Sequence, residues 1–287
     1  MPVGSVSTAV LRDAATVALL RDGTSGLQVF LMRRPATMRF AAGMYVFPGG
    51  AVEPGDRDLP LVDDAALLPL ADRAATAFPR SLLAAAVRET FEECGVLLAV
   101  PDGPVPAPVA AERVALTEGR LGLAELLTAH RLAVDPGALP LVGHWVTPEL
   151  GTHRYDTRFF VAAMPADQQA SDVSPETEGS AWWEPAAAVA AHRAGELAML
   201  PPTLATLGWL ATQRTVAVAL LAAPTLRVRP LLPQRRPDPD GRTRWVLTDA
   251  RTGERLRPAD TGVTADSSEA DVLGGVAEIH DASGRLA

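Results

Sequence analysis

The segment 88–95, RETFEECG, places one arginine and three glutamates within six residues. Glu89, Glu92 and Glu93 are three and four residues apart, so they share one face of a helix. Like charges at this spacing destabilise a helix by roughly 0.2–0.5 kcal/mol per pair. Arg88 is the only cation beside them, and no lysine follows at i+4 to pair with them. The face therefore needs a cation from outside the helix.

A glutamate-rich helix face is most often solvated surface, and that alternative has to be weighed first. Against it, these carboxylates repel one another, and they follow a Gly49-Gly50 turn that lets the backbone approach closely. Three hard oxygen ligands on a rigid face suit Mg²⁺ or Mn²⁺. In enzymes such ions commonly polarise a phosphate or pyrophosphate and activate water. The pattern therefore predicts a divalent-metal site for a phosphorylated substrate.

The composition excludes several other kinds of chemistry. All 26 basic side chains are arginines, which rules out a lysine Schiff base and a Walker-type phosphate loop. Neither G-x-S-x-G nor G-x-G-x-x-G occurs. Cys94 is the only cysteine, so no internal disulfide forms, and it falls on an apolar helix side. The five histidines lack zinc-ligand spacing and lie at positions 130, 144, 153, 192 and 280.

Charge and hydropathy bear on partners and location. A net charge of −8 argues against nucleic-acid or anionic-membrane binding. There is no uninterrupted apolar run long enough for a membrane helix, and the N-terminal residues lack a signal-peptide pattern. We therefore expect a cytoplasmic protein that binds a small molecule, with no membrane and no nucleic-acid partner.

The acidic face must be carried by a helix over residues 81–94. Apolar residues recur on its opposite side at Leu83, Val87 and Phe91. Ser81 is expected to be the N-cap, and Gly95 to end the helix in a left-handed conformation. The metal-binding face and the core-facing side are thus expected to be opposite sides of one helix.

The other predicted elements alternate between strand and helix. Strands are expected at 14–20, 27–33, 44–48, 96–100, 143–147, 156–165, 181–185, 226–233 and 242–250, and further helices at 122–132, 186–197 and 201–222. The first two strands are joined by a turn-forming sequence and should form a hairpin. Interleaved strands and helices predict an α/β fold with a mixed sheet.

The chain is expected to divide after residue 223. Residues 1–223 form the main domain, within which 57–79 reads as a surface excursion rich in Asp and Pro. Residues 224–287 form an extension that is polar and loose after 257. Two roles are left open for it, which are adding strands to the sheet and building a homodimer contact.

These motifs resemble the Nudix hydrolase superfamily, whose box reads G-x5-E-x7-R-E-U-x-E-E-x-G-U with U apolar. Gly50 begins the box, and RETFEECGV completes it with Thr90 at the first apolar position. Asp56 stands where the family has its first glutamate, and residues 57–79 lengthen the spacer before Arg88. The resemblance covers roughly residues 10–223 and implies a Nudix α/β/α sandwich.

One branch of the family is particularly similar. FPGG precedes the box at 47–50, and Arg34, Arg39 and Gly43 match the upstream signature of coenzyme A-directed Nudix enzymes. With the split box, HRYDTRFFVA and LPPT, the chain looks most like the peroxisomal type of coenzyme A diphosphatase. In RYDTRFF, Asp156 and Arg158 are expected to form a structural ion pair.

The resemblance assigns roles within the box. Glu92 and Glu93 would be metal ligands, together with the Gly50 carbonyl. Glu89 would be a ligand or a base that Arg88 orients. The implied cofactor is Mg²⁺ or Mn²⁺.

Further roles fall outside the box. A loop carboxylate would come from Glu178, with Glu176 as the alternative. Arg34 and Arg39 would bind substrate phosphates, such as the 3′-phosphate of coenzyme A. Surface arginines without a ligand are the competing interpretation for both.

The implied activity is a metal-dependent diphosphatase acting on coenzyme A or an acyl-CoA, with 3′-phospho-ADP and a phosphopantetheine as products. Alternative substrates are ADP-ribose, NADH and oxidised nucleotides, because residues outside the box set the substrate. A third hypothesis is a non-catalytic nucleotide-binding sensor that keeps the fold.

Overall fold

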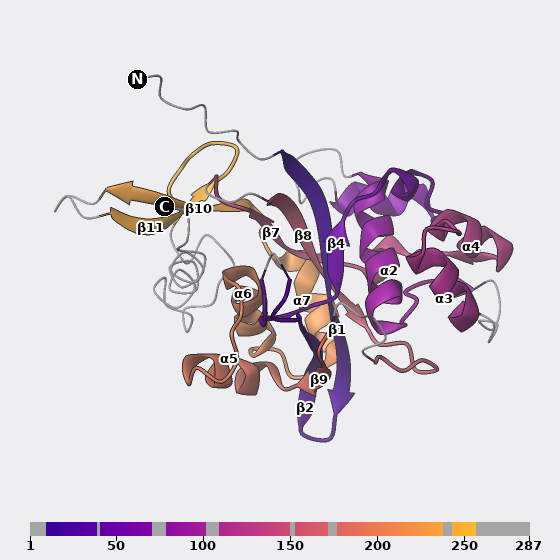
Figure 1. Cartoon of the computed structure of the whole chain (residues 1–287), viewed down its shortest axis with the longest axis horizontal. Coiled ribbons are helices and arrows are strands. Elements are labelled where there is room, and N and C mark those ends of the chain that lie inside the picture. Colours follow the sequence, from indigo (N-terminus) through magenta and orange to yellow (C-terminus); the bar gives the residue numbers. More distant parts are fainter. Residues whose placement is uncertain are drawn as a thin grey trace.

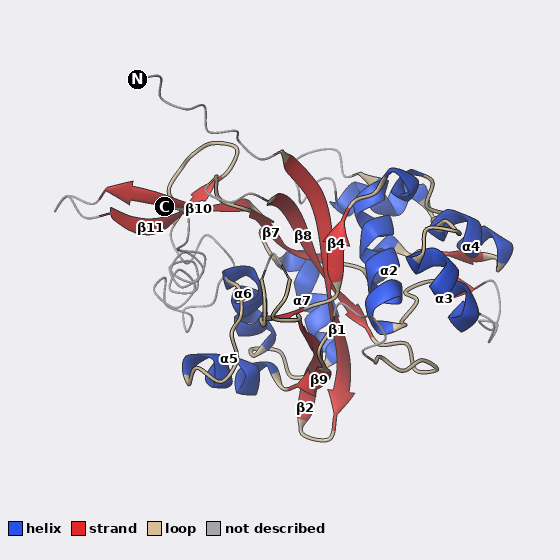
Figure 2. Cartoon of the chain, viewed as in Figure 1, coloured by secondary structure: helices blue, strands red, loops and turns tan. Residues whose placement is uncertain are grey.

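A computed structural model describes residues 10–38, 41–70, 79–101, 109–149, 153–171, 177–237 and 243–256. Helices cover both faces of a central mixed sheet (Figures 1 and 2). One face carries α2 (Arg80–Cys94), with α3 (Val109–Thr117) and α4 (Leu123–Ala129) beyond it. The other carries α5 (Pro185–Arg193), α6 (Pro201–Leu210) and α7 (Val216–Ala222). The predicted α/β/α sandwich is confirmed.

Nine strands of the described residues form one sheet, in the order β11-β10-β7-β8-β1-β2-β3, with β4 paired to β1 and β9 to β2. Their bounds are β1 Leu11–Gly23, β2 Gly26–Arg33, β3 Tyr45–Val46, β4 Gly49–Ala51, β7 Leu141–Val146, β8 Arg154–Ala163, β9 Ser180–Trp183, β10 Pro230–Pro237 and β11 Thr243–Asp249. The β1–β8 and β7–β10 pairs are parallel and the others antiparallel, so the sheet is mixed. The predicted β1–β2 hairpin is confirmed.

The register of four adjacent strands aligns a row of residues across the sheet. Gly50 of β4 pairs with Ala15 of β1, Ala15 pairs with Arg158 of β8, and Arg158 pairs with His144 of β7. Partners in register project to the same face of a sheet. Since Ala15 belongs to the core beneath α2, the whole row lies on the α2 face.

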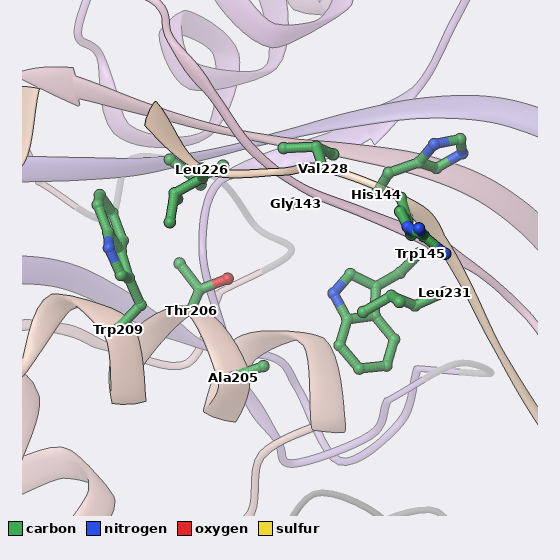
Figure 3. A pocket seen from close by; sticks show the side chains of 11 residues that line it. Gly143, His144, Trp145, Ala205, Thr206, Trp209, Leu226, Val228 and Leu231 are labelled. Carbon is green, nitrogen blue, oxygen red and sulfur yellow. The ribbon is translucent and has the colours of Figure 1, made fainter. Parts of the chain in front are cut away.

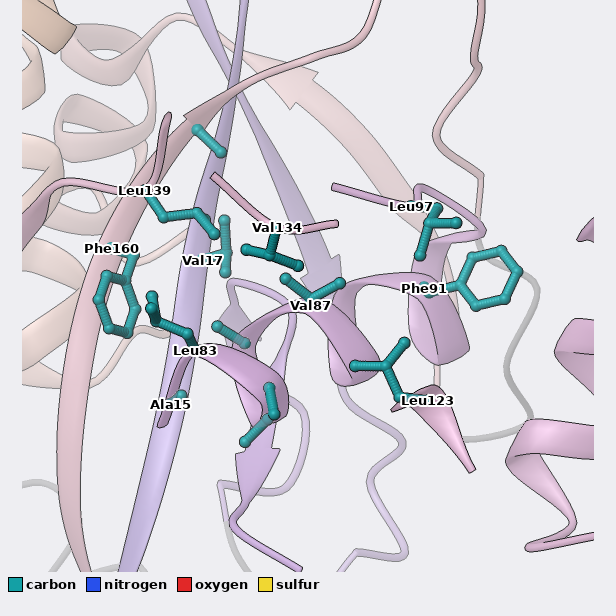
Figure 4. Close-up of a cluster of buried hydrophobic side chains, with 14 of the residues drawn as sticks. Ala15, Val17, Leu83, Val87, Phe91, Leu97, Leu123, Val134, Leu139 and Phe160 are labelled. Atoms are coloured by element: carbon teal, nitrogen blue, oxygen red, sulfur yellow. The ribbon is translucent and has the colours of Figure 1, made fainter. Parts of the chain in front are cut away.

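Two hydrophobic cores hold these layers together, one on each face of the sheet. Beneath α2, Leu83 and Val87 pack near Ala15, Val17 and Phe160 of the sheet (Figure 4). The second core joins the other face to α5, α6 and α7. Leu82 through Arg88 are all buried, so α2 is enclosed on nearly all sides rather than amphipathic with a solvated face.

The ends of α2 differ in part from the expectation. Its N-cap is Pro79, with φ −67° and ψ 130°, and Ser81 lies inside the first turn. Proline fits this boundary because its fixed φ suits the start of a helix and its ring disfavours helix before it. At the other end Gly95 has φ 74°, so the predicted left-handed cap is confirmed.

Two predicted elements are wrong. Of the expected 96–100 strand, only Val100 lies in a strand, as the first residue of β5 (Val100–Pro101), which pairs with β6 (Leu132–Ala133). Val96 and Leu97 are nevertheless buried in the core, because an apolar run signals burial more reliably than strand. The expected helix 201–222 is divided into α6 and α7. Helix α3 was not foreseen.

The break between α6 and α7 has a local cause. Thr215 is extended, and its side-chain oxygen accepts a hydrogen bond from the Val218 amide at 3.2 Å. A threonine cap of this kind starts a new helix rather than continuing the old one.

Residues 57–79 are only partly a surface excursion. A 3-10 turn, η1 (Pro54–Arg57), precedes them and a second, η2 (Asp64–Leu67), lies within them. Leu59 and Leu70 are buried in the core beneath α2. These leucines anchor the described part of the segment, which contradicts a purely superficial loop. Residues 71–78 lie outside the described residues.

The C-terminal extension continues the sheet. Strands β10 and β11 pair with each other, and β10 also pairs with β7 in parallel. Of the two roles left open, adding strands is confirmed, whereas the homodimer contact and the boundary after 223 stay predictions. The expected looseness after 257 falls outside the described residues. Within the described ranges, no helix is long and apolar enough to span a membrane.

Candidate active site

Arg88 lies at the centre of the predicted site and is almost fully buried. Its Nε donates to Asp56 Oδ1 at 3.0 Å, and its Nη2 donates to Asp56 Oδ2 at 3.2 Å. This bidentate geometry is a strong form of arginine–carboxylate ion pair. Asp56, only 2% exposed, also accepts from the Glu53 amide at 2.7 Å within the η1 turn. Asp56 therefore contacts Arg88 of the box helix α2 despite the long insertion between them.

The remaining donors of Arg88 bind the acidic face and the neighbouring strand. Nη1 donates to Glu89 Oε1 at 2.9 Å and to Glu92 Oε2 at 3.2 Å, and Nη2 donates to the Ala51 carbonyl at 2.9 Å. One guanidinium thus faces three carboxylates, those of Asp56, Glu89 and Glu92, which leaves a net charge of −2 when all three are ionised (1 − 3). Arg88 organises these carboxylates without neutralising them.

The Gly49-Gly50 turn brings the backbone of β4 against the same carboxylates. The Gly49 amide donates to Glu93 Oε2 at 2.8 Å. A Cβ added to Gly50 would lie 2.2 Å from Glu89 Oε1, far inside van der Waals contact. Glycine at position 50 is therefore what allows Glu89 to lie against the strand.

Burial changes the proton affinity of this cluster. It raises the pKa of Glu89 to about 7, an effect that Arg88 partly offsets and the charge of Glu92 reinforces. Burial likewise raises the pKa of Glu92, again against the influence of Arg88. For Arg88, burial acts to lower the pKa, but hydrogen bonding to Asp56 and the surrounding acids outweigh it, so the pKa lies above its ordinary value. The positive charge of Arg88 therefore does not fully compensate for the burial of the Glu89 and Glu92 carboxylates.

This donor set fits a divalent cation by charge and by ligand type. It combines hard carboxylate oxygens with an excess of negative charge. Within the described part of the chain, however, no three acidic, histidine or cysteine side chains converge on one point. Glu89 and Glu92 are turned towards Arg88, and Glu93 towards the Gly49 amide. Holding a metal would require these side chains to turn towards it.

The chain matches the Nudix hydrolases in both sequence and structure. The family profile described as the NUDT19 Nudix domain matches residues 73–210. The crystal structure of a NUDIX hydrolase from Alicyclobacillus acidocaldarius is 30% identical, covering 74% of this chain and 96% of that one with a TM-score of 0.62. The protein belongs to the Nudix hydrolase family.

Three curated relatives of this Nudix hydrolase share one name. Acyl-coenzyme A diphosphatase NUDT19 from Xenopus laevis is 24% identical over 224 residues, covering 63% of this chain and 59% of the relative. The Homo sapiens protein of that name is 28% identical over 233 residues, covering 66% of this chain and 62% of the relative. The chain thus spans less than two thirds of the length of either. These matches confirm the resemblance to the coenzyme A diphosphatase branch.

The other predicted site residues of this Nudix hydrolase lie apart from α2. Glu178 precedes β9, where its Oε1 accepts from the Ala36 amide at 3.4 Å and its own amide donates to the Arg33 carbonyl at 2.8 Å. Arg34 is half-buried in the neighbouring segment, and its buried Nε has no hydrogen-bond partner among the described residues. No described hydrogen bond joins Glu178 to the acidic face. Arg39 and Glu176 lie outside the described residues.

A small open pocket lies beside β7, and His144 is among the residues that line it (Figure 3). It lies between β7 and α6, and Trp145, Thr206 and Trp209 contribute side chains to it. None of the residues that line it belongs to the acidic cluster around Arg88. It does not form part of the predicted site.

A second polar cluster shares the α2 face with the acidic site. Arg158 Nη1 pairs with Asp156 Oδ1, which confirms the predicted ion pair. His144 of β7 joins it, with Nε2 2.5 Å from the same Asp156 oxygen. Burial lowers the pKa of His144, partly offset by its bond to Asp156. Burial acts to raise the pKa of Asp156, but its bonds to His144 and Arg158 prevail and hold the pKa below its ordinary value.

The participation of His144 was not found from the sequence. Positions 156 and 158 are two residues apart on one strand, so the sequence predicts that they share a face of the sheet. The sequence does not predict which strand pairs with theirs or in what register. Only a signal for β7–β8 pairing could have joined His144 to them.

Proposed function

We propose that this Nudix hydrolase is a metal-dependent diphosphatase that cleaves the pyrophosphate bond of coenzyme A or an acyl-CoA. The observation that carries the proposal is the buried acidic cluster, in which Arg88 meets three carboxylates beside the Gly49-Gly50 turn. Such a cluster is costly unless a cation completes it. The names of the curated relatives support coenzyme A as the substrate.

Glu92 and Glu93 would hold Mg²⁺ or Mn²⁺ together with the Gly50 carbonyl, and Glu89 would be either a further ligand or the base. When bound, the metal would polarise the diphosphate and lower the pKa of the attacking water, so that the water loses a proton more easily and becomes a better nucleophile. Arg88 orients Glu89 and Glu92 through Nη1. It also fixes α2 to β4 through the Ala51 carbonyl.

Glu89 is suited to accept the proton of the attacking water. Its Oε1 is bound to Arg88, so Oε2 would take the proton. A pKa near 7 matches a base that works at neutral pH. The water oxygen bonds to one phosphorus as the bridging P–O bond breaks, without a covalent enzyme intermediate. The adenosine part keeps its 3′-phosphate and one phosphate of the former diphosphate, so the products are adenosine 3′,5′-bisphosphate, in place of the expected 3′-phospho-ADP, and a phosphopantetheine.

Substrate binding is assigned to the segment that follows β2. Arg34 and Arg39 would bind phosphate oxygens, and the buried, unpartnered Nε of Arg34 supports an acceptor supplied by a ligand. Glu178, or Glu176 in its place, would supply a further carboxylate from the loop before β9. The contacts of Glu178 with the Ala36 amide and the Arg33 carbonyl support a role near Arg34.

The substrate is tested by mass-spectrometric product analysis in ¹⁸O-labelled water. The panel contains coenzyme A, acetyl-CoA, ADP-ribose, NADH and oxidised dGTP, each with Mg²⁺ or Mn²⁺. We expect CoA species to give adenosine 3′,5′-bisphosphate and a phosphopantetheine, with ¹⁸O in one product marking the attacked phosphorus. Cleavage of another diphosphate alone would favour the alternative substrates, and binding without any turnover would favour the sensor.

The metal role is tested with Glu93→Gln. Its matched control is Glu125→Gln, which removes the same charge from an exposed position on α4. We expect Glu93→Gln to lower turnover by roughly 10²-fold or more, because a carboxylate ligand is lost. Full turnover in Glu93→Gln would refute the ligand assignment.

The remaining proposals concern assembly and location. We expect a cytoplasmic protein whose partner is a small nucleoside diphosphate derivative, and its net charge of −8 argues against a nucleic-acid partner. A homodimer through residues 224–287 is tested by light scattering of the full chain against a chain ending at residue 256. An unchanged number of subunits after truncation would argue against a dimer contact beyond residue 256.

A further inference from the structure

The row of residues across the sheet connects the acidic site to the second polar cluster. Gly50, against which Glu89 lies, and Arg158 are both register partners of Ala15 on β1. Neighbouring strands are about 4.8 Å apart, so the Cα atoms of Gly50 and Arg158 are about 10 Å apart. The residue between them is an alanine, which places no long side chain in the row. A diphosphate bound at Gly50 therefore lies within the span of an arginine side chain from β8.

Arg158 is held from one side only. It is 9% exposed, and its Nη1 binds Asp156, which His144 in turn holds from β7. Its Nε is buried and has no hydrogen-bond partner among the described residues. Buried N–H donors are nearly always paired in native proteins, so an unpaired one marks a place where a ligand or water supplies the acceptor.

We propose that Arg158 binds the diphosphate of the substrate, at the phosphoryl group farther from the acidic cluster. The inference rests on the proposed diphosphatase function and adds a binding residue to that site. A phosphate oxygen is an anionic acceptor that matches the planar guanidinium fork. Asp156 and His144 are positioning residues, because they fix one edge of the guanidinium and leave the other for the ligand.

The test is calorimetric titration of the full-length protein with inorganic pyrophosphate and Mg²⁺. The variants are Arg158→Gln and the control Arg154→Gln, which removes the same charge from the same face of β8 farther along the strand. We expect Arg158→Gln to bind pyrophosphate roughly 10- to 100-fold more weakly, the loss that follows from removing charge-assisted hydrogen bonds. Arg154→Gln should stay within about twofold of the wild type.

Three results would overturn the inference. The first is equal affinity in Arg158→Gln and the wild type, which would mean that the Nε partner is water only. The second is an equal loss of affinity in Arg158→Gln and Arg154→Gln. The third is no pyrophosphate binding by the wild type. Should Arg158→Gln fail to fold, Arg158→Lys is used, since it keeps the charge and loses the fork. We expect Arg158→Lys to keep its melting temperature and still lose affinity.

Turnover separates this inference from the proposed function. If pyrophosphate binding depends on Arg158 while no diphosphate on the panel is cleaved, the diphosphatase assignment fails and the phosphate site stands. If CoA species are cleaved and Arg158→Gln keeps the wild-type KM and kcat, the diphosphatase assignment stands and the role of Arg158 fails. With both correct, KM for the diphosphate rises in Arg158→Gln and is unchanged in Arg154→Gln.

Discussion

Two buried arginines on one face of the sheet occupy opposite electrostatic settings. Arg88 is surrounded by three carboxylates, and every described contact of its guanidinium is made with an acceptor of the protein. Arg158 has one carboxylate, which it shares with His144, and a buried Nε without a described partner. The first cluster is short of positive charge, and the second is short of an acceptor.

This difference indicates how the two clusters could cooperate. A divalent cation would complete the first, and an anionic oxygen would complete the second. A diphosphate carrying a metal ion would supply both at once. The register that places Gly50 and Arg158 on either side of Ala15 fixes the distance between the two clusters.

The largest expected effect is on stability, when each arginine is replaced by methionine. Arg88→Met leaves Asp56 buried at 2% exposure without its ion pair, so we expect it to lower the free energy of unfolding by about 3–5 kcal/mol. Arg158→Met should lower it by about 1–2 kcal/mol, because Asp156 is 22% exposed and keeps its bond to His144. Urea unfolding of metal-free protein at pH 8 measures both.

A second substitution isolates the cause. Asp56→Asn in the Arg88→Met background removes the unpaired buried charge and should recover part of the lost stability. Equal losses in the two single variants, or no recovery in the double variant, would show that the two arginines do not differ as described.

The sequence predicts what depends on local spacing. The box helix, its Gly95 end and the β1–β2 hairpin follow from apolar periodicity and turn residues, and the structure confirms them. The acidic side chains gather as expected because positions 89, 92 and 93 share a face of any helix. The acidic pattern itself predicted a divalent-metal site, and the family resemblance added the individual ligand roles, including that of the Gly50 carbonyl.

What the sequence does not give is the contact between distant segments. Asp56 reaches Arg88 across the insertion because Leu59 and Leu70 are buried and anchor that segment, which composition alone had assigned to the surface. His144 joins Asp156 through a strand register that no local pattern encodes. The division of helix 201–222 was missed because the Thr215 cap lies within an otherwise helical apolar pattern.

A smaller effect is expected in the pH dependence of stability. Glu89 has a pKa near 7 in the folded protein and near 4.5 when unfolded, so the folded state binds more protons between these values. Stability should therefore fall as pH rises from about 4.5 to 7, by about 1–3 kcal/mol, and level off above 7. Urea unfolding of metal-free protein from pH 5 to 8 measures the slope.

Two comparisons identify Glu89 as its source. Glu89→Gln should flatten the slope, since the glutamine does not titrate. Added Mg²⁺ should restore stability above pH 7, where Glu89 is ionised, and have less effect near pH 5. A slope that persists unchanged in Glu89→Gln would assign it to another group.

The smallest expected effect comes from adding one methyl group at Gly50. In Gly50→Ala the new Cβ would lie 2.2 Å from Glu89 Oε1, so the carboxylate must move away from the strand. Because the group that moves is the end of a side chain, we expect little change in stability and a fall in kcat of about tenfold, or about 1.4 kcal/mol of barrier. Gly55→Ala is the control, since a Cβ there meets nothing within 4 Å.

Gly50→Ala also tests whether the two clusters are separable. The substitution displaces Glu89 but leaves Arg158 in place, two strands away. Steady-state kinetics should therefore show the loss in kcat, while calorimetry should show pyrophosphate binding within about threefold of the wild type, a difference of less than 1 kcal/mol. A parallel loss of pyrophosphate affinity would mean that Glu89 and Arg158 act as one unit, and the contrast between the two arginines would then describe a single continuous site.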